Sequence, residues 1–150
     1  MTDLSEPLFL FGPGYCARAL AARWAGPVFG SFRSESSREN LRGSNIQPVS
    51  IADPAGLTTA LTGAHLLISA PPDAQGCPAL QVLAGMLDEV ASVTYLSTTG
   101  VYGDLRGGWA MAWSPPKPQS ERAQRRLIAE QAWRGTGKPL AIVRLPGIYG

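Results

Sequence analysis

The sequence predicts an α/β protein with a doubly wound, all-parallel sheet between two layers of helices. Short apolar runs alternate with helix-compatible segments along the chain, which is the pattern of repeated strand–helix–strand units. The first run, residues 8–11, shows no polar–apolar alternation, as expected for a strand buried on both faces. Glycine and proline account for 17 and 13 of the 150 residues and stand between the runs, where they mark turns.

The first half of the chain predicts three strands and three helices. Residues 8–11 form the first strand, and Gly12 and Gly14 then force a turn. Alanine and leucine are dense from residue 15 to residue 24, as in a helix. The remaining elements of this half are expected as strand 28–32, helix 35–42, strand 46–51 and helix 54–61.

The second half continues the alternation. The clearest strand covers residues 66–70 and is stopped by two prolines, and three leucines at helical spacing predict a helix over 79–91. The last regular elements are expected as strand 93–97, helix 121–134 and strand 140–145. The long irregular segment 103–118 either lies at a binding site or uses Trp109 and Trp113 to cover an edge of the core.

Composition excludes several classes of function. The chain is 45% apolar, which suits one domain over residues 1–150, and its net charge of +2 does not favour nucleic acid or an acidic membrane as a partner. One histidine, His65, and two cysteines, Cys16 and Cys77, are too few for a structural zinc site or a disulfide scaffold. The start is acidic and no apolar stretch is long enough to span a bilayer, so a cytoplasmic location is expected.

Residues 12–17 form the motif G-x-G-x-x-A between a strand and a helix. The first glycine permits a tight turn, the second lets a pyrophosphate approach the backbone, and the small third residue allows the helix to pack on the strand. Free N–H groups at the start of the helix would hold the phosphates. The turn therefore predicts a dinucleotide site, although a glycine turn needed only for packing is the alternative.

The residues after the second strand predict which dinucleotide is bound. An acidic residue there would bind the ribose 2′-hydroxyl of NAD, whereas arginine favours the 2′-phosphate of NADP. The sequence has Arg33 and Ser34, with Arg38 one helical turn further on. A guanidinium and a hydroxyl suit a phosphate monoester, so NADP is favoured over NAD.

Four motifs together resemble the short-chain dehydrogenase/reductase superfamily, in its extended or atypical branch of NAD(P)-dependent epimerase/dehydratase-like proteins. They are the glycine turn, Asp53 after the third strand, residues 97–104 (S-T-T-G-V-Y-G-D), and residues 144–150 (R-L-P-G-I-Y-G). The resemblance implies a three-layer Rossmann domain with strand order 3-2-1-4-5-6 and a nicotinamide dinucleotide as cofactor. It also implies that the chain lacks a C-terminal substrate-binding region that such proteins carry, and that its last helix could pair subunits in a homodimer.

The resemblance implies a role for each residue that matches a motif. The cofactor contacts would be Gly12, Gly14 and Tyr15 at the pyrophosphate with Cys16 beside them, Arg33 and Ser34 at the 2′-phosphate, Asp53 at adenine, Ser69, Ala70 and Pro71 along a ribose, and Ser97 and Pro146 in the two later motifs. Thr98 would take the place of the catalytic Ser/Thr and bind a substrate oxygen.

The catalytic Tyr–Lys pair of the family is absent. Counting back from Glu130, the lysine position holds Arg126 and the tyrosine position holds Arg122. Arg126 could still bind a ribose, but a guanidinium is not an acid near neutral pH. Tyr102 could replace the missing tyrosine as the catalytic acid only if its side chain does not serve in packing.

Three functions are therefore open. The first is NAD(P) binding in an oxidoreductase- or epimerase/dehydratase-like protein that acts on an unknown small molecule. The second is a non-catalytic module that binds or senses a dinucleotide and contacts a partner protein. The third is an anion- or nucleic-acid-binding surface on helix 121–134, which carries Arg122, Arg125 and Arg126. The alternative for this helix is an ordinary solvent-exposed face, on which nearby glutamates partly neutralise the arginines.

Overall fold

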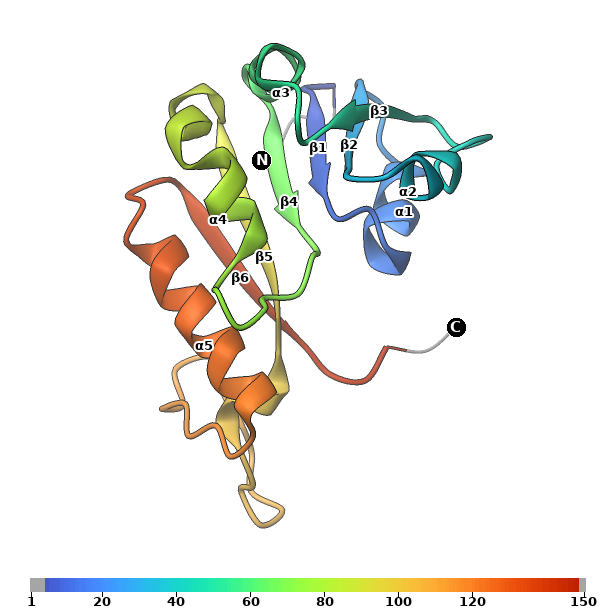
Figure 1. Ribbon diagram of the computed structural model, residues 1–150. Coiled ribbons are helices and arrows are strands. Elements are labelled where there is room, and N and C mark those ends of the chain that lie inside the picture. Colours follow the sequence, from blue (N-terminus) through green and yellow to red (C-terminus); the bar gives the residue numbers. More distant parts are fainter. Residues whose placement is uncertain (1–4, 149–150) are drawn as a thin grey trace.

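The computed structural model describes residues 5–148. Six parallel strands form one sheet in the order β3-β2-β1-β4-β5-β6, so the fold and strand order expected from the sequence are confirmed (Figure 1). The strands are β1 (Leu8–Phe11), β2 (Val28–Phe32), β3 (Ile46–Ser50), β4 (His65–Ile68), β5 (Ser92–Thr98) and β6 (Leu140–Leu145). The α-helices are α1 (Tyr15–Ala21), α2 (Glu35–Glu39), α3 (Pro54–Leu61), α4 (Pro78–Leu83) and α5 (Glu121–Arg134), and the 3-10 helices are η1 (Ala84–Glu89) and η2 (Thr99–Tyr102).

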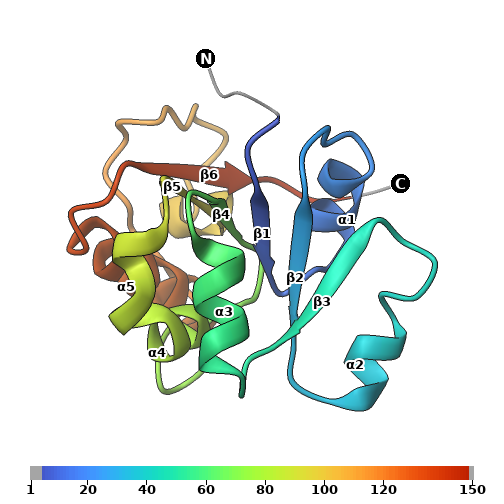
Figure 2. The same ribbon diagram turned by 90° about the horizontal axis from the view of Figure 1, so that it is seen from above.

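The two faces of β1 explain why this strand has no polar residue. Phe9 and Phe11 belong to a core cluster with residues of α3, α4 and α5, whereas Leu8 and Leu10 belong to a second cluster with residues of α1. Helices α1 and α2 therefore lie on one side of the sheet and α3, α4 and α5 on the other (Figure 2). Burying large apolar side chains on both faces is the main contribution to stability here, at roughly 1.5–3 kcal/mol for each.

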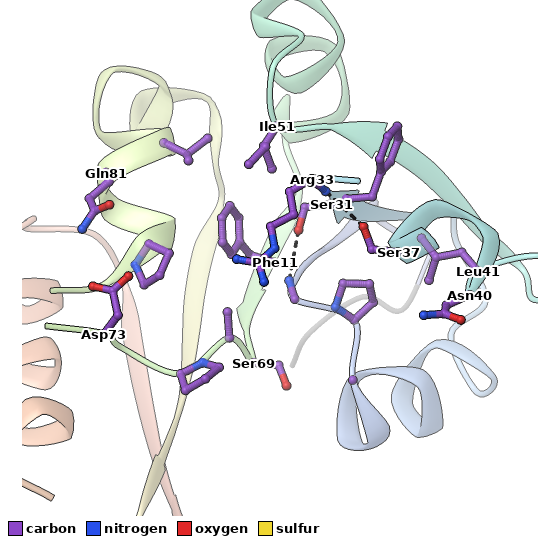
Figure 3. A pocket seen from close by; sticks show the side chains of 18 of the residues that line it. Phe11, Ser31, Arg33, Ser37, Asn40, Leu41, Ile51, Ser69, Asp73 and Gln81 are labelled. Carbon is purple, nitrogen blue, oxygen red and sulfur yellow. Dashed lines mark hydrogen bonds between the residues drawn. The ribbon is translucent and has the colours of Figure 1, made fainter. Parts of the chain in front are cut away.

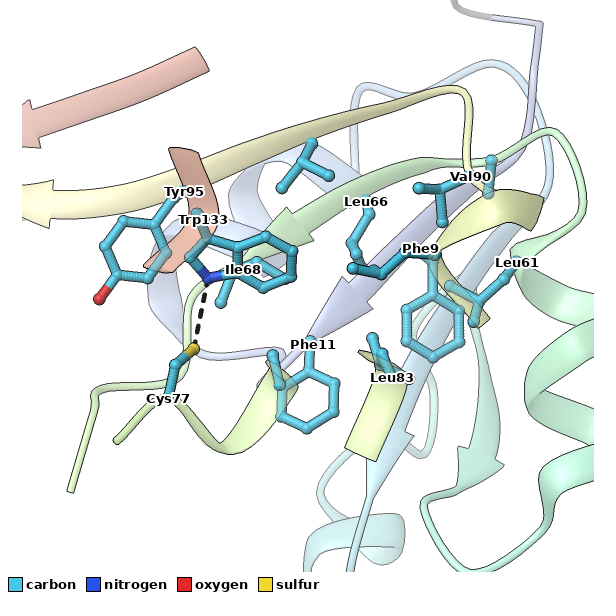
Figure 4. Close-up of a cluster of buried hydrophobic side chains, with 14 of the residues drawn as sticks. Phe9, Phe11, Leu61, Leu66, Ile68, Cys77, Leu83, Val90, Tyr95 and Trp133 are labelled. Carbon is cyan, nitrogen blue, oxygen red and sulfur yellow. Dashed lines mark hydrogen bonds between the residues drawn. The ribbon is translucent and has the colours of Figure 1, made fainter. Parts of the chain in front are cut away.

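The larger core cluster is organised around an aromatic pair from the second half of the chain. Tyr95 of β5 and Trp133 of α5 are both fully buried, and they lie beside Ile68 and Cys77 (Figure 4). The indole Nε1 of Trp133 donates a hydrogen bond to the sulfur of Cys77 at 3.4 Å. This contact gives the buried indole N–H a partner and fixes α5 against the segment that leads into α4.

Several boundaries differ from the sequence-based expectation, and two of the differences have an identifiable cause. The helix expected over 79–91 is α4 followed by η1, with the poor helix former Gly85 near the change. Strand β4 ends at Ile68 instead of Ala70, because the N–H groups of Ser69 and Ala70 both donate to the carbonyl of Phe11, at 3.0 and 3.1 Å. Helices α1 and α2 each end three residues before the expected position.

The long segment 103–118 is irregular, as expected, but it does not cover a core edge. Trp109 is 88% exposed and Trp113 is 82% exposed. The packing alternative for these two side chains is therefore wrong. The segment projects from the carboxyl end of β5 beside the start of α5 (Figure 1).

Candidate functional site

A pocket of about 780 Å³ lies where β1, β2 and β4 end. This is the edge at which open parallel sheets bind ligands, next to the point where the strand order reverses. Six of the sequence-predicted cofactor residues line it, and Figure 3 shows the side chains around it. These six are Gly12, Gly14, Arg33, Ser69, Ala70 and Pro71.

Gly12 is required by the fold itself. Its φ of +79° lies in the left-handed region, and a Cβ atom there would come within 2.7 Å of the Ala70 side chain and 2.8 Å of the Ala70 nitrogen. Its N–H donates to the hydroxyl of Ser31 on β2 at 3.0 Å. The turn is therefore fixed between β4 on one side and β2 on the other.

Gly14 has no comparable structural reason. Its φ is −84°, which any residue adopts, and an added Cβ would meet only the Gly12 carbonyl at 3.9 Å and the Ser69 hydroxyl at 4.0 Å. A side chain would thus stand in the open space between the turn and β4. A glycine at this position keeps the pocket open where the backbone of the turn faces it.

Arg33 follows β2 and reaches into the pocket (Figure 3). Its backbone N–H donates to the hydroxyl of Ser37 at 3.3 Å, and Ser37 itself lines the pocket. Ser34, which the sequence placed at the 2′-phosphate, instead caps α2 by accepting from the Ser37 N–H at 3.3 Å. Arg38 is paired with Glu35 at 3.3 Å and is not one of the pocket-lining residues.

The remaining predicted cofactor residues lie outside the pocket lining. Asp53 caps α3 by accepting from the Gly56 N–H at 3.0 Å, and Ile51 lines the pocket from the same segment. Tyr15 is 62% exposed on the first turn of α1, and Cys16 beside it is half-buried. Pro146 follows β6, while Tyr149 and Gly150 of the same motif are outside the described residues.

The predicted catalytic residues gather at a second place, at the carboxyl end of β5. The hydroxyl of Thr98, the last residue of β5, accepts from the Gly100 N–H at 3.1 Å. Arg126 donates to the carbonyl of Leu96 at 2.7 Å and lies over the ring of Tyr95. Arg122 is exposed one turn before it on α5. None of Thr98, Tyr102 and Arg126 lines the pocket described above.

A buried ionic network lies behind Thr98. The carboxylate of Glu130, 1% exposed, receives both Nε and Nη2 of Arg144 at 3.0 and 2.7 Å, and the hydroxyl of Ser97 at 2.5 Å. Arg144 also donates to the hydroxyl of Tyr102 at 2.9 Å. Burial alone would raise the pKa of Glu130, but the hydrogen bonds from Arg144 and Ser97 outweigh it and the pKa is lowered. In the same way, the bond to Glu130 raises the pKa of Arg144.

This network accounts for two predicted site residues. Ser97 is buried and donates to Glu130, and Tyr102 is buried and accepts from Arg144. The side chains join β5, η2, α5 and β6 around the end of β5. Both residues are therefore engaged in holding these elements together.

Sequence reasoning missed six polar residues of the pocket: Arg18, Ser31, Ser37, Asn40, Asp73 and Gln81. The sequence did indicate Ser31, because it is a polar residue within the otherwise apolar strand β2. Arg18 and Asn40 carried no such signal because they are adjacent only in space, where Arg18 donates to the Asn40 carbonyl.

Within residues 5–148, no group of three or more His, Cys, Asp or Glu side chains could hold a metal ion. No helix in that same range has the length and apolar character needed to cross a membrane.

Solved structures match the chain over nearly its whole length. A conserved protein of unknown function from Silicibacter pomeroyi is 35% identical, with a TM-score of 0.84, over 97% of this chain and 54% of that one. UDP-glucuronic acid 4-epimerase from Bacillus cereus, in complex with NAD, is 18% identical with a TM-score of 0.71, over 96% and 58%. A short-chain dehydrogenase/reductase superfamily protein from Agrobacterium tumefaciens with bound NAD is 20% identical with a TM-score of 0.63, over 91% and 48%.

No family model matches the sequence, and no curated protein matches it. The chain spans about half the length of the solved structures that it matches. The chain has a Rossmann-like α/β fold with a single all-parallel sheet, and in this fold it is similar to solved structures of NAD-dependent epimerase/dehydratase and short-chain dehydrogenase/reductase superfamily proteins.

Proposed function

We propose that this chain binds a nicotinamide dinucleotide, preferentially NADP(H), as the cofactor-binding part of an oxidoreductase- or epimerase/dehydratase-like protein. The observation that carries the proposal is Gly14, a glycine that the fold does not need and that faces the pocket. A pyrophosphate can approach the backbone there only if no side chain intervenes. The solved structures with the same fold include complexes with NAD.

The pocket residues suit the two ends of the adenosine diphosphate moiety. Gly12 and Gly14 would face the pyrophosphate, and Ser69 and Pro71 would lie along the opposite wall beside the ribose. Arg33 would bind a 2′-phosphate, and a planar guanidinium suits this because it can form two parallel hydrogen bonds to phosphate oxygens. Asp53 and Ser34, both engaged as helix caps, would contribute through the backbone that they hold.

The proposed chemistry is limited by the residues at the end of β5. A bound nicotinamide supplies a hydride acceptor or donor. Thr98 would orient a substrate oxygen, while position 122, where the family's acid would stand, holds an arginine in place of the tyrosine. Tyr102 is buried and bonded to Arg144, which argues against its use as the acid. The alternative function, a dinucleotide-binding module without turnover that contacts a partner protein, is favoured by these same residues.

We expect calorimetric titration to give tighter binding of NADPH than of NADH. Replacing Arg33 by glutamine should weaken NADPH binding about tenfold or more, because a charge-assisted hydrogen bond is lost, and should change NADH binding little. Arg38→Gln is the matched control, since Arg38 lies one turn away, is paired with Glu35 and is outside the pocket lining.

The same titration can contradict the proposal. If the wild-type chain binds neither nucleotide, the glycine turn serves packing alone and the proposed function is wrong. If both bind, oxidation of NADPH in the presence of a panel of carbonyl compounds separates the enzyme from the binding module. Steady turnover supports an enzyme, whereas binding without turnover across the panel supports the module.

A further inference from the structure

Arg18 projects from α1 into the wall of the pocket and is tied down at two points. Its Nε donates to the carbonyl of Pro13 in the glycine turn at 3.2 Å, and its Nη2 donates to the carbonyl of Asn40, the residue that caps the end of α2. A guanidinium has five N–H donors, so these two bonds leave three donors for a ligand. The side chain is therefore held in place before any ligand arrives.

The charge of Arg18 is not neutralised by a carboxylate. Arg38 and Arg42 on and after α2 form ion pairs with Glu35 and Glu39. Within the part of the chain that the structure describes, neither Arg18 nor Arg33 has an acidic side chain in ion-pair contact. Both of the unmatched cations line the same pocket.

Both arginines are attached to α2. The hydroxyl of Ser37 accepts from the backbone N–H of Arg33, and the backbone carbonyl of Asn40, at the end of α2, accepts from the guanidinium of Arg18. Ser37 and Asn40 both line the pocket, so Arg33 and Arg18 flank this part of its wall from the β2 side and the α1 side.

Arg18 reaches from the glycine turn toward α2. Its Nε is bonded to the carbonyl of Pro13, next to Gly14, while its Nη2 is bonded to the carbonyl of Asn40 at the end of α2, the helix that also receives the N–H of Arg33. The space in front of Gly14 opens toward Ser69, which follows β4. The contact with Asn40 therefore favours a phosphate shared with Arg33 over a pyrophosphate at Gly14.

We propose that Arg18 is a second specificity-determining residue, which together with Arg33 binds a phosphate group on the adenosine ribose of the dinucleotide. The inference rests on the proposed function, since it concerns the same pocket. It assigns the preference for a phosphorylated nucleotide to two arginines from different elements, with Ser37 and Asn40 as the residues that position them.

The test is calorimetric titration of the full chain with NADPH, NADH, 2′-AMP and 5′-AMP. Arg18→Gln should weaken binding of NADPH and 2′-AMP about tenfold or more, while binding of NADH and 5′-AMP should change less than about threefold. Arg18→Lys, which keeps the charge but loses the forked donor, should lie between the wild type and Arg18→Gln. Circular dichroism and the melting temperature show whether each variant is folded.

Arg23→Gln is the matched control. Arg23 follows α1, donates to the Ala19 carbonyl at 3.1 Å and does not line the pocket, so its removal changes the net charge equally without touching the site. All four affinities should stay at the wild-type values in this variant.

Two results would overturn the inference while leaving the proposed function intact. An equal loss for NADPH and NADH in Arg18→Gln would place Arg18 at the pyrophosphate or in the support of the turn. Unchanged affinity for NADPH and 2′-AMP would show that Arg18 does not bind the phosphate. Absence of any binding by the wild-type chain would instead overturn the proposed function, and this inference with it.

Discussion

Replacing Arg144 by alanine is expected to lower the free energy of unfolding by about 3–5 kcal/mol at pH 7. Arg144 gives Glu130 two hydrogen bonds, at 3.0 and 2.7 Å, and Glu130 is almost fully buried. Without the guanidinium, the carboxylate would keep only Ser97 as a partner and its charge would be uncompensated. Urea unfolding followed by tryptophan fluorescence measures the change, with Trp133 as a buried reporter.

The destabilisation caused by Arg144→Ala should depend on pH. The pKa of Glu130 is lowered in the folded state, so the pair stabilises the protein fully above the ordinary glutamate pKa of about 4.3, and this contribution is lost as pH falls through the lowered value. In Arg144→Ala, burial without the partner should raise the pKa of Glu130. The difference in free energy of unfolding between the wild type and Arg144→Ala should therefore become smaller from pH 7 toward pH 4.

A double variant separates the charge from the packing. Glu130→Met/Arg144→Met removes both charges at similar size and should destabilise less than Arg144→Ala alone, because no buried charge is left unpaired. A loss below about 1 kcal/mol in Arg144→Ala at pH 7 would contradict the assignment of this pair as a structural link between α5 and β6.

The second large effect is a contrast between the two glycines of the turn. Gly12→Ala should destabilise the fold by about 2 kcal/mol or more, because the new Cβ meets Ala70 at 2.7 Å and the residue must keep a φ of +79°. Gly14→Ala should cost less than about 1 kcal/mol, since its backbone suits any residue and the nearest atom is 3.9 Å away. Denaturant unfolding of both variants measures these changes.

Gly14→Ala, the variant that destabilises the fold less, should show the clear loss of nucleotide binding. The methyl group of Gly14→Ala would stand between the turn and Ser69, so NADPH binding should fall about tenfold or more although the fold is kept. Ala19→Gly on the exposed side of α1 is the control for a one-carbon change, and its NADPH affinity should match that of the wild type. Wild-type affinity in Gly14→Ala would mean that the ligand does not approach the turn.

Local pattern was sufficient to predict the order of the elements. The apolar runs at β1, β2 and β6 have the predicted bounds, as do helices α3 and α5, because each is delimited by glycine, proline or a capping residue. The end of β4 was predicted wrongly because a distant partner decides it. The N–H groups after Ile68 end β4 by turning to Phe11, and nothing in the residues around position 68 indicates this.

The sequence by itself determined the order of strands and helices along the chain and the glycine turn, since these depend on residues that are neighbours along the chain, and the family resemblance added the strand order of the sheet. It also placed Arg33 and Ser69 at strand ends, from which they line one pocket. Only the tertiary structure decided how the side chains are used. It engages Ser97 and Tyr102 in the network of Glu130 and Arg144, and brings Arg18 of α1 to Asn40 of α2. Hydrogen bonds between residues 22 to 42 positions apart depend on how helices pack on the sheet, and a single sequence carries no local signal for them.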